Sequence, residues 1–392
     1  MAALLAAAPE PVRVGVVGGG LMGRELAGLL GRWPSLVDHP VRPVLAAVAD
    51  PAPAARAWFE RLGVPTHERW DALLDDPDID VVYLAVPHDL HEEVYVAAAR
   101  AGKDLLGEKP FGIDLPAARR IAAAIDEAGV FARASSEMPF FPGAQRAFAH
   151  VASGGLGEVV EVRSGFSHSS DLDRTKPSNW KRRAATCGEL GVMGDLGLHV
   201  AHLPLRLGWR PSQVYAQLDD VVTSRPSPEG DVPCDTWDNA LLATRVPHTA
   251  ARAFPMLWEA RRIAPGQMNT WWFEALGMDG GVRFSTRSPA VLDRFKVRRT
   301  PAGGVAEQVW EQVQPGSVSA WPTSAGPIFE FGFADALLQM WAAFLAERAG
   351  ALGDRFGCAT PAEAVTAHEV FDAALRSHAS GAAVPVGSGR LD

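Results

Sequence analysis

Three glycines near the N-terminus have the spacing that a dinucleotide-binding turn requires. The pattern is Gly18-x-Gly20-x-x-Gly23, with Leu21 and Met22 before the last glycine. The first glycine permits a tight turn, the second lets backbone N–H groups approach a pyrophosphate, and the third allows a helix to pack closely on a strand. The positive end of that helix also stabilises phosphates. The alternative is a glycine-rich turn without a ligand, so the interpretation depends on the elements around it.

A carboxylate further along would select between the two nicotinamide dinucleotides. Asp50 can accept hydrogen bonds from both ribose hydroxyls of NAD, whereas its charge would repel the 2′-phosphate of NADP. The interval from Gly23 exceeds the usual ~20 residues, and we attribute the excess to an inserted loop over Trp33–Pro43. Asp50 could instead serve only as a helix cap. We predict NAD.

The elements that must position these residues alternate from Val12 to Ala134. The predicted strands are Val12–Val17, Val44–Ala49, Val81–Ala85, Asp104–Leu106 and Val130–Ala134, and the predicted helices are Leu21–Trp33, Ala54–Leu62, His91–Ala101 and Asp114–Ala128. Unbroken apolar strands that alternate with helices indicate a parallel sheet covered on both faces. We therefore predict an α/β Rossmann domain, with a doubly wound parallel sheet, over residues 10–135.

The remaining residues, 136–392, have a different pattern. Strands are predicted at Glu158–Ser167, Val214–Val222, Ala240–Val246, Thr270–Ala275, Val282–Ser285, Arg294–Arg299 and Glu307–Val313. Helices are predicted at Phe141–Ser153, Leu198–Leu207, Phe333–Arg348 and Pro361–Ser377, while Thr223–Pro233 and Pro315–Gly326 are Pro/Gly/Ser-rich connections. Successive strands indicate an α+β domain with an open, mainly antiparallel sheet. We assign this domain to substrate binding and oligomerisation.

Three polar residues could handle a proton next to a bound dinucleotide. Hydride removal from a carbinol carbon leaves a proton on oxygen, so the site needs a base of near-neutral pKa, which histidine supplies. His199 is the candidate base, and Lys109 could stabilise the developing alkoxide or relay its proton. Asp195 precedes His199 by four residues, and if this segment is helical the two face the same side. From the residues alone, it is equally possible that Asp195 is only a helix cap and that His199 is a buried histidine without a catalytic role.

A series of short motifs resembles one family. After the glycine turn come Val86-Pro87-His88-Asp89-Leu90-His91, Ala101-Gly102-Lys103, Glu108-Lys109-Pro110, Gly154-Gly155-Leu156-Gly157-Glu158-Val159 and Met193-Gly194-Asp195-Leu196-Gly197-Leu198-His199. Together they resemble the glucose–fructose oxidoreductase / inositol dehydrogenase / rhizopine-catabolism family of sugar oxidoreductases. The motifs extend over roughly residues 12–210, and the rest of the chain matches by architecture.

The resemblance implies specific residues. It makes Lys109, Asp195 and His199 the catalytic groups. It implies NAD contacts at Gly18, Gly20, Leu21, Met22, Gly23, Asp50, Glu108 and Lys109, and in the loop after Ala85 at Val86, His88 and His91.

Three positions depart from the family pattern. His88 stands where asparagine is common, and His202 stands where aspartate is common. Glu137 lies where an Arg-Phe pair is usual, near the crossing between the domains. We predict altered substrate contacts at Glu137 and His202.

A cationic loop precedes the Asp195 segment. Asn179, Trp180, Lys181 and Arg182 lie in it, with further cations at Lys176 and Arg183. Such a loop could hold an anionic substituent, and its indole could stack on a sugar. The alternative is a solvated or salt-bridged loop.

Two reactions fit this set of residues. The leading prediction is an NAD-dependent oxidoreductase that acts on a CH–OH group of a sugar, cyclitol or glycoside, with or without an anionic substituent. The alternative is an NAD-dependent glycosidase that oxidises C3 transiently, eliminates the aglycone and recycles NAD in place. A dinucleotide sensor is disfavoured because Lys109, Asp195 and His199 are all present.

The composition disfavours two kinds of partner, nucleic acid and membrane. A net charge of −9 disfavours nucleic acid, and no apolar run approaches the ~20 residues of a membrane span. The three cysteines have no disulfide or zinc spacing, so we predict a cytoplasmic protein without a metal site. An apolar sheet face would need a cover, and the resemblance implies a homodimer or homotetramer.

Overall fold

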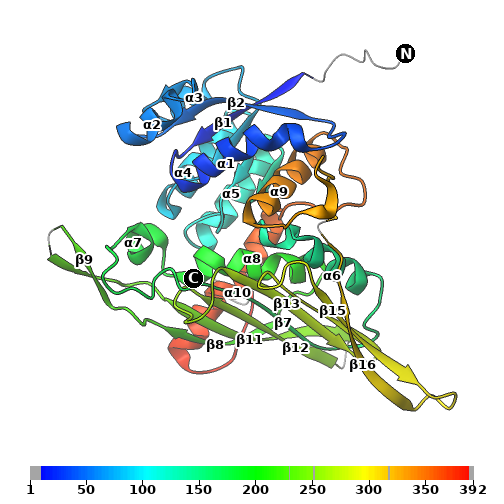
Figure 1. Ribbon diagram of the computed structural model, residues 1–392. Helices are drawn as coiled ribbons and strands as arrows, with labels where there is room; N and C mark the ends of the chain where they lie inside the picture. The colour runs from blue at the N-terminus through cyan, green and yellow to red at the C-terminus, as the bar shows by residue number, and fades with distance from the viewer. Residues whose placement is uncertain (1–9, 229, 250–251, 317, 388–392) are drawn as a thin grey trace, which may run out of the picture.

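The computed structural model describes residues 10–228, 230–249, 252–316 and 318–387. Two sheets lie one above the other, with helix α8 (Val192–Arg206) between them (Figure 1). The upper sheet is formed by the N-terminal third of the chain and the lower one by the remainder. The Rossmann and mixed-sheet halves predicted from the sequence are confirmed.

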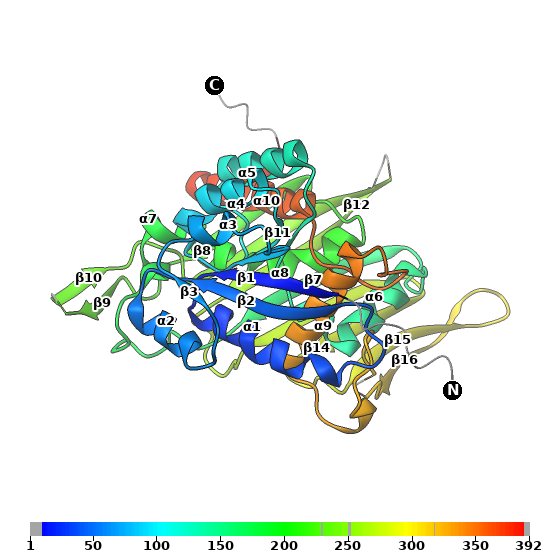
Figure 2. The ribbon, with the colours of Figure 1, turned by 90° about the horizontal axis from the view of Figure 1, so that it is seen from above.

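The upper sheet has six parallel strands in the order β3-β2-β1-β4-β5-β6. The strands are β1 (Pro11–Val17), β2 (Arg42–Ala49), β3 (Thr66–His67), β4 (Val81–Leu84), β5 (Asp104–Gly107) and β6 (Ala132–Ala134). Helices α1 (Leu21–Arg32), α2 (Pro53–Glu60), α3 (Asp71–Leu74), α4 (His91–Arg100) and α5 (Leu115–Ala128) connect them and cover both faces (Figure 2). The strand order reverses between β1 and β4, which is where such sheets bind ligands.

The lower sheet has nine strands in the order β16-β15-β14-β13-β7-β12-β11-β8-β17. They are β7 (Val159–Ser167), β8 (Gln213–Asp219), β11 (Asn239–Thr249), β12 (Arg252–Arg261), β13 (Thr270–Gly277), β14 (Gly280–Ser285), β15 (Leu292–Arg299), β16 (Val305–Val313) and β17 (Val384–Pro385). Neighbouring strands pair antiparallel except β7 and β12, which are parallel. Helices α6 (Pro142–Ala152), α8 and α10 (Pro361–Ser380) contact strands of this sheet.

Three local predictions need correction. The segment Thr223–Pro233, predicted as a connection, contains a hairpin of β9 (Ser224–Ser227) and β10 (Gly230–Pro233). Strand β12 was not predicted, because Pro255 interrupts its pattern. Helix α8 begins at Val192 and not at Leu198.

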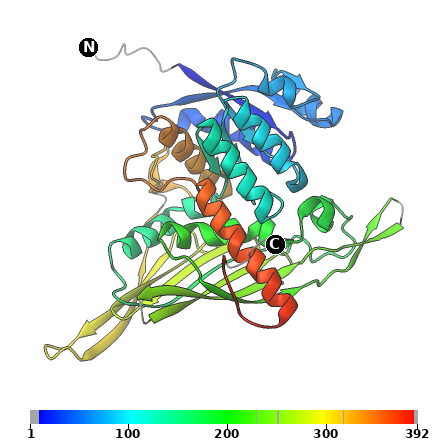
Figure 3. The ribbon, with the colours of Figure 1, turned by 180° about the vertical axis from the view of Figure 1, so that it is seen from behind.

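The C-terminal helices return to the N-terminal sheet. Helix α10 lies against α5, with an ion pair between Arg119 and Glu369 (Figure 3). Helix α9 (Phe333–Arg348) contacts α1, and the N–H of Ala134 donates to the carbonyl of Ala359. The proposed boundary at residue 135 therefore separates the two sheets, while α9 and α10 join the two halves.

Among the described residues, no helix combines the length and the hydropathy that a bilayer crossing needs.

Candidate active site

A cavity of about 730 Å³ opens at the carboxyl ends of the parallel strands, where their order reverses. It brings together most of the predicted cofactor contacts. Its lining includes Gly18, Gly20, Leu21, Met22, Asp50, Val86, His88, Glu108 and Lys109, and on the opposite side Trp180 and Lys181.

The glycine turn has the shape that its spacing predicts. Gly18 has a φ of 105°, and a Cβ there would overlap the carbonyl of Ala85. A Cβ on Gly23 would overlap the carbonyl of Gly18, so Gly23 serves the packing of α1. A Cβ on Gly20 would have no neighbour within 4 Å. The space in front of Gly20, at the N-terminus of α1, therefore suits the pyrophosphate of a dinucleotide.

Asp50 is fixed beside this turn. Its Oδ2 accepts a hydrogen bond of 2.8 Å from the N–H of Gly19, and its Oδ1 accepts one of 2.8 Å from the N–H of Ala52. The carboxylate thus supports the start of α2 and also lines the cavity. A role at the start of α2 and a contact with the cofactor, which the sequence left as alternatives for Asp50, are therefore compatible.

The sequence analysis missed one wall of the cavity. Glu68, Arg69 and Trp70 line it next to Asp50. They follow β3, which has only two residues and therefore shows no periodicity in the sequence.

Lys109, Asp195 and Lys181 form one ionic cluster. The Nζ of Lys109 lies 2.8 Å from Oδ1 of Asp195, and the Nζ of Lys181 lies 2.7 Å from the same oxygen. Lys109 follows β5, Asp195 lies in the first turn of α8, and Lys181 lies in the short helix η4 (Trp180–Arg182). The structure therefore brings together residues 86 positions apart.

The cluster fixes the charge of its members. Although burial raises the pKa of Asp195, the charges of Lys109 and Lys181 outweigh burial and hold that pKa well below its usual range. Burial lowers the pKa of Lys109, but Asp195 and Glu108 outweigh it and raise the pKa. Burial lowers the pKa of Lys181. At neutral pH, Asp195 is a carboxylate and Lys109 is an ammonium group.

His199 lies one turn after Asp195 on α8, as the spacing predicts, but the two are not hydrogen-bonded. Its Nδ1 lies 3.7 Å from Oε2 of Glu137. Burial, and next the charge of Lys109, lower the pKa of His199 well below its usual value. The imidazole is therefore neutral, and it is a weaker base in this arrangement than the near-neutral histidine expected from the sequence.

His88 replaces the asparagine of the family pattern within the cavity. Its Nδ1 lies 2.9 Å from the carbonyl of Cys187. A carbonyl only accepts, so Nδ1 carries the proton and Nε2 presents a lone pair. The ring packs edge-on against Trp180, with centroids 4.8 Å apart. His88 therefore links the N-terminal half to the loop that carries Lys181.

Eight predicted site residues lie outside the cavity lining: Gly23, His91, Glu137, Asn179, Arg182, Asp195, His199 and His202. Of the predicted catalytic residues, only Lys109 lines the cavity. The ring nitrogens of His91 are taken by the carbonyl of Val86 and the N–H of Gly112. His202 is buried next to Phe356, with ring centroids 5.0 Å apart. The Asn179 side chain accepts from the N–H of Lys181 and caps η4. These residues support the site without lining it.

The cationic loop is salt-bridged. Arg182 is buried and pairs with Asp171 and, at 2.8 Å, with Asp238. Lys176 pairs with Asp171 at 2.8 Å, and Lys181 pairs with Asp195. The structure therefore does not bring Arg182 to the cavity. Carboxylates of the protein neutralise most of the positive charge that could have bound an anion.

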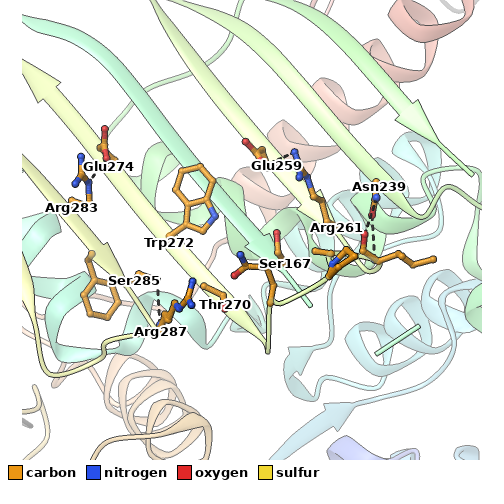
Figure 4. A pocket seen from close by; sticks show the side chains of 15 residues that line it. Ser167, Asn239, Glu259, Arg261, Thr270, Trp272, Glu274, Arg283, Ser285 and Arg287 are labelled. Atoms are coloured by element: carbon orange, nitrogen blue, oxygen red, sulfur yellow. Dashed lines mark hydrogen bonds and ion pairs between the residues drawn. The ribbon is translucent and has the colours of Figure 1, made fainter. Parts of the chain in front are cut away.

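A second cavity, of about 580 Å³, lies on the open face of the lower sheet (Figure 4). Trp272 stands between the pairs Glu259–Arg261 and Glu274–Arg283 there. None of the predicted catalytic residues lines it.

Comparisons with known proteins agree with this architecture. A family model described as "Oxidoreductase family, NAD-binding Rossmann fold" matches residues 12–135. A second, "GFO/IDH/MocA C-terminal domain", matches residues 144–283. Together these matches span more than half of the 392 residues.

Individual relatives act on carbohydrates. Levoglucosan dehydrogenase from Pseudarthrobacter phenanthrenivorans is 28% identical over 296 residues, 70% of this chain and 74% of that protein. A dTDP-3,4-didehydro-2,6-dideoxy-alpha-D-glucose 3-reductase from Actinomadura kijaniata is 30% identical over 248 residues, 63% of this chain and 69% of that protein.

A solved structure shares the whole fold. Levoglucosan dehydrogenase in complex with NADH and levoglucosan has a TM-score of 0.85, covers 97% of this chain and 100% of its own, and is 24% identical. The two matched domains, the glycine turn and the shared fold lead to one conclusion: this chain belongs to the GFO/IDH/MocA family of NAD-binding oxidoreductases.

Proposed function

We propose that this protein oxidises a secondary alcohol of a neutral sugar, cyclitol or glycoside, with NAD as the hydride acceptor. The observation that carries the proposal is the Lys109–Asp195–Lys181 cluster beside the cofactor cavity. The named activities of two relatives, a levoglucosan dehydrogenase and a dTDP-sugar 3-reductase, support carbohydrate as the substrate class, and the first of these names a neutral sugar.

The roles follow from the charges of the groups. Bound NAD supplies the carbon that receives the hydride. The Lys109 ammonium donates a hydrogen bond to the substrate oxygen and stabilises the developing alkoxide. It cannot itself accept the proton while it is charged, whereas His199 is neutral and can. Asp195 holds both lysines at the oxygen that reacts.

A neutral substrate is favoured over an anionic one. Lys176 and Arg182 are already paired with carboxylates outside the cavity, and Lys181 is paired with Asp195. An anionic group would compete with these carboxylates. The lysines instead offer N–H donors to hydroxyl oxygens.

The test is a panel of neutral sugars, anionic sugars and glycosides, followed by both NADH absorbance at about 340 nm and aglycone release. We expect NADH in proportion to neutral substrate consumed. Aglycone release without net NADH would replace the proposal with the glycosidase, and NAD binding without turnover of any compound would indicate a sensor.

A further inference from the structure

Glu137 is a buried carboxylate that the proposed mechanism leaves without a role. It follows β6 and precedes the short helix η3 (Met138–Phe140), and only 5% of it is exposed. Its own backbone N–H donates to the carboxylate, and among the described residues its recorded ion-pair contact is with Nδ1 of His199, at 3.7 Å. That nitrogen is buried and has no hydrogen-bond partner there.

We propose that Glu137 is the positioning residue of His199: its carboxylate keeps a proton on Nδ1, so that Nε2 carries the lone pair that takes the substrate's proton. The distance of 3.7 Å is longer than a hydrogen bond, so the proposal requires the two side chains to approach each other by roughly 0.5 Å or more. A buried ring N–H without an acceptor is costly, which favours that approach. This inference rests on the proposed oxidation.

Asp195 cannot take this role in the arrangement seen. Its Oδ1 accepts from Lys109 and Lys181. The two carboxylates therefore divide the work. Asp195 orients the lysines toward the substrate oxygen, and Glu137 sets the tautomer of the base.

The proton and electron balance is complete. As the O–H bond of the substrate breaks, its proton passes to Nε2 of His199. The electron pair of that O–H bond forms the second bond between oxygen and the carbinol carbon. The C–H bond at this carbon breaks, and its electron pair leaves with the hydride to NAD. The resulting imidazolium is paired with the Glu137 carboxylate until the proton is released to water.

The pair has a pH dependence whose sign follows from its surroundings. Glu108 and Lys109 face it from the end of β5, Tyr83 from β4, Asp195 and His202 from α8, and Lys181 from η4. Burial, together with the charge of Glu108, raises the pKa of Glu137 to about 7. Above that pH the carboxylate accepts from Nδ1. Below it the carboxylic acid donates to Nδ1, and the ring proton moves to Nε2, where it blocks the base.

The first experiment compares the pH profiles of the wild type and Glu137→Gln. We expect kcat/KM for oxidation to rise with pH through about 7 in the wild type. In Glu137→Gln it should fall by about 100-fold and lose this limb, while Glu137→Asp should restore part of both. Glu127→Gln, an exposed change on α5, is the matched control and should match the wild type. An unchanged limb in Glu137→Gln, or a loss confined to KM, would overturn the proposal.

The second experiment needs no substrate. In protein labelled with ¹⁵N-histidine, with His199→Gln used for assignment, the ring shifts report which nitrogen carries the proton. We expect Nδ1–H at pH 8.5 and Nε2–H at pH 5.5 in the wild type, and no such exchange in Glu137→Gln. A tautomer that is unaffected by the substitution would refute the pairing. If the exchange occurs but no sugar is turned over, the pairing stands and the proposed function fails.

Discussion

Asp195 accepts hydrogen bonds from two lysines at one oxygen, which sets the electrostatics of the site. A single buried carboxylate accepts from two lysine side chains, so it leaves one of their positive charges unbalanced within the cluster. Such a charge favours an alkoxide over an alcohol. The four-residue spacing from Asp195 to His199 suggested a shared helix face, but the predicted helix began only at Leu198, so the place of Asp195 in the first turn of α8 is a finding of the structure. Its pairing with Lys181 could not be predicted either, because that contact depends on how the loop before α8 folds.

Lys109→Ala should separate catalysis from cofactor binding. We expect kcat/KM to fall by about 100–1000-fold, because the alkoxide loses its donor. The affinity for NAD, measured by calorimetry, should stay within a few-fold of the wild type, since the glycine turn and Asp50 remain. Lys296→Ala, an exposed change on β15, is the control for loss of a lysine. Retained turnover in Lys109→Ala would rule out the assigned role.

Asp50→Asn tests the choice of cofactor. The amide keeps an acceptor for the N–H of Gly19, loses the acceptor for the N–H of Ala52, and removes the charge that repels a 2′-phosphate. We expect the preference for NAD over NADP to shrink by about tenfold, equivalent to 1.4 kcal/mol. The ratio of the two dissociation constants measures this, with the exposed Asp126→Asn as control. Equal losses for both dinucleotides would contradict a ribose contact.

At the scale of elements, α8 shows where sequence patterns are insufficient. The sequence predicts a start at Leu198, whereas α8 begins at Val192, and Gly191, Gly194 and Gly197 weaken the helical pattern over the residues between. In the structure Gly197 lies against the ring of Phe371 on α10, and a Cβ there would overlap that ring. The glycine that obscured the helix in the sequence is the one that lets α10 approach it. By contrast, α9 was predicted at its observed limits, since its apolar residues are continuous.

Gly197→Ala should therefore destabilise the protein although alanine favours helix. We expect the free energy of unfolding to fall by about 1–3 kcal/mol from overpacking, and Phe371→Leu should recover part of that loss. Chemical denaturation measures both. Gly28→Ala is the matched control, because a Cβ at that exposed position in α1 meets nothing within 4 Å. It should raise stability by up to about 1 kcal/mol. A stabilised Gly197→Ala variant would show that α8 and α10 are not in close contact.

At the scale of the whole molecule, the remaining feature is the face of the lower sheet that lies opposite its helices. Helices α6, α8 and α10 contact one side of the sheet. On the other side lie Tyr215, Leu241, Leu257, Trp272 and Leu276, all of them at least partly exposed. The Trp272 indole lies over Gly165 between two ion pairs (Figure 4). An apolar centre with an aromatic residue and a charged rim is typical of protein interfaces.

We propose that a second copy of the chain covers this face, so that the protein is at least a dimer. Trp272→Glu should then convert it to monomers at micromolar concentration, because a buried unpaired carboxylate at each of two related positions opposes association. Sedimentation equilibrium measures the change. Leu62→Glu places the same charge at an exposed apolar residue beyond α2, away from the sheet, and should leave the assembly intact. A monomeric wild type, or a Trp272→Glu variant that assembles as the wild type does, would place the interface elsewhere or remove it. Because the cofactor cavity lies on the other sheet, the monomeric variant should still bind NAD with wild-type affinity, which separates assembly from folding.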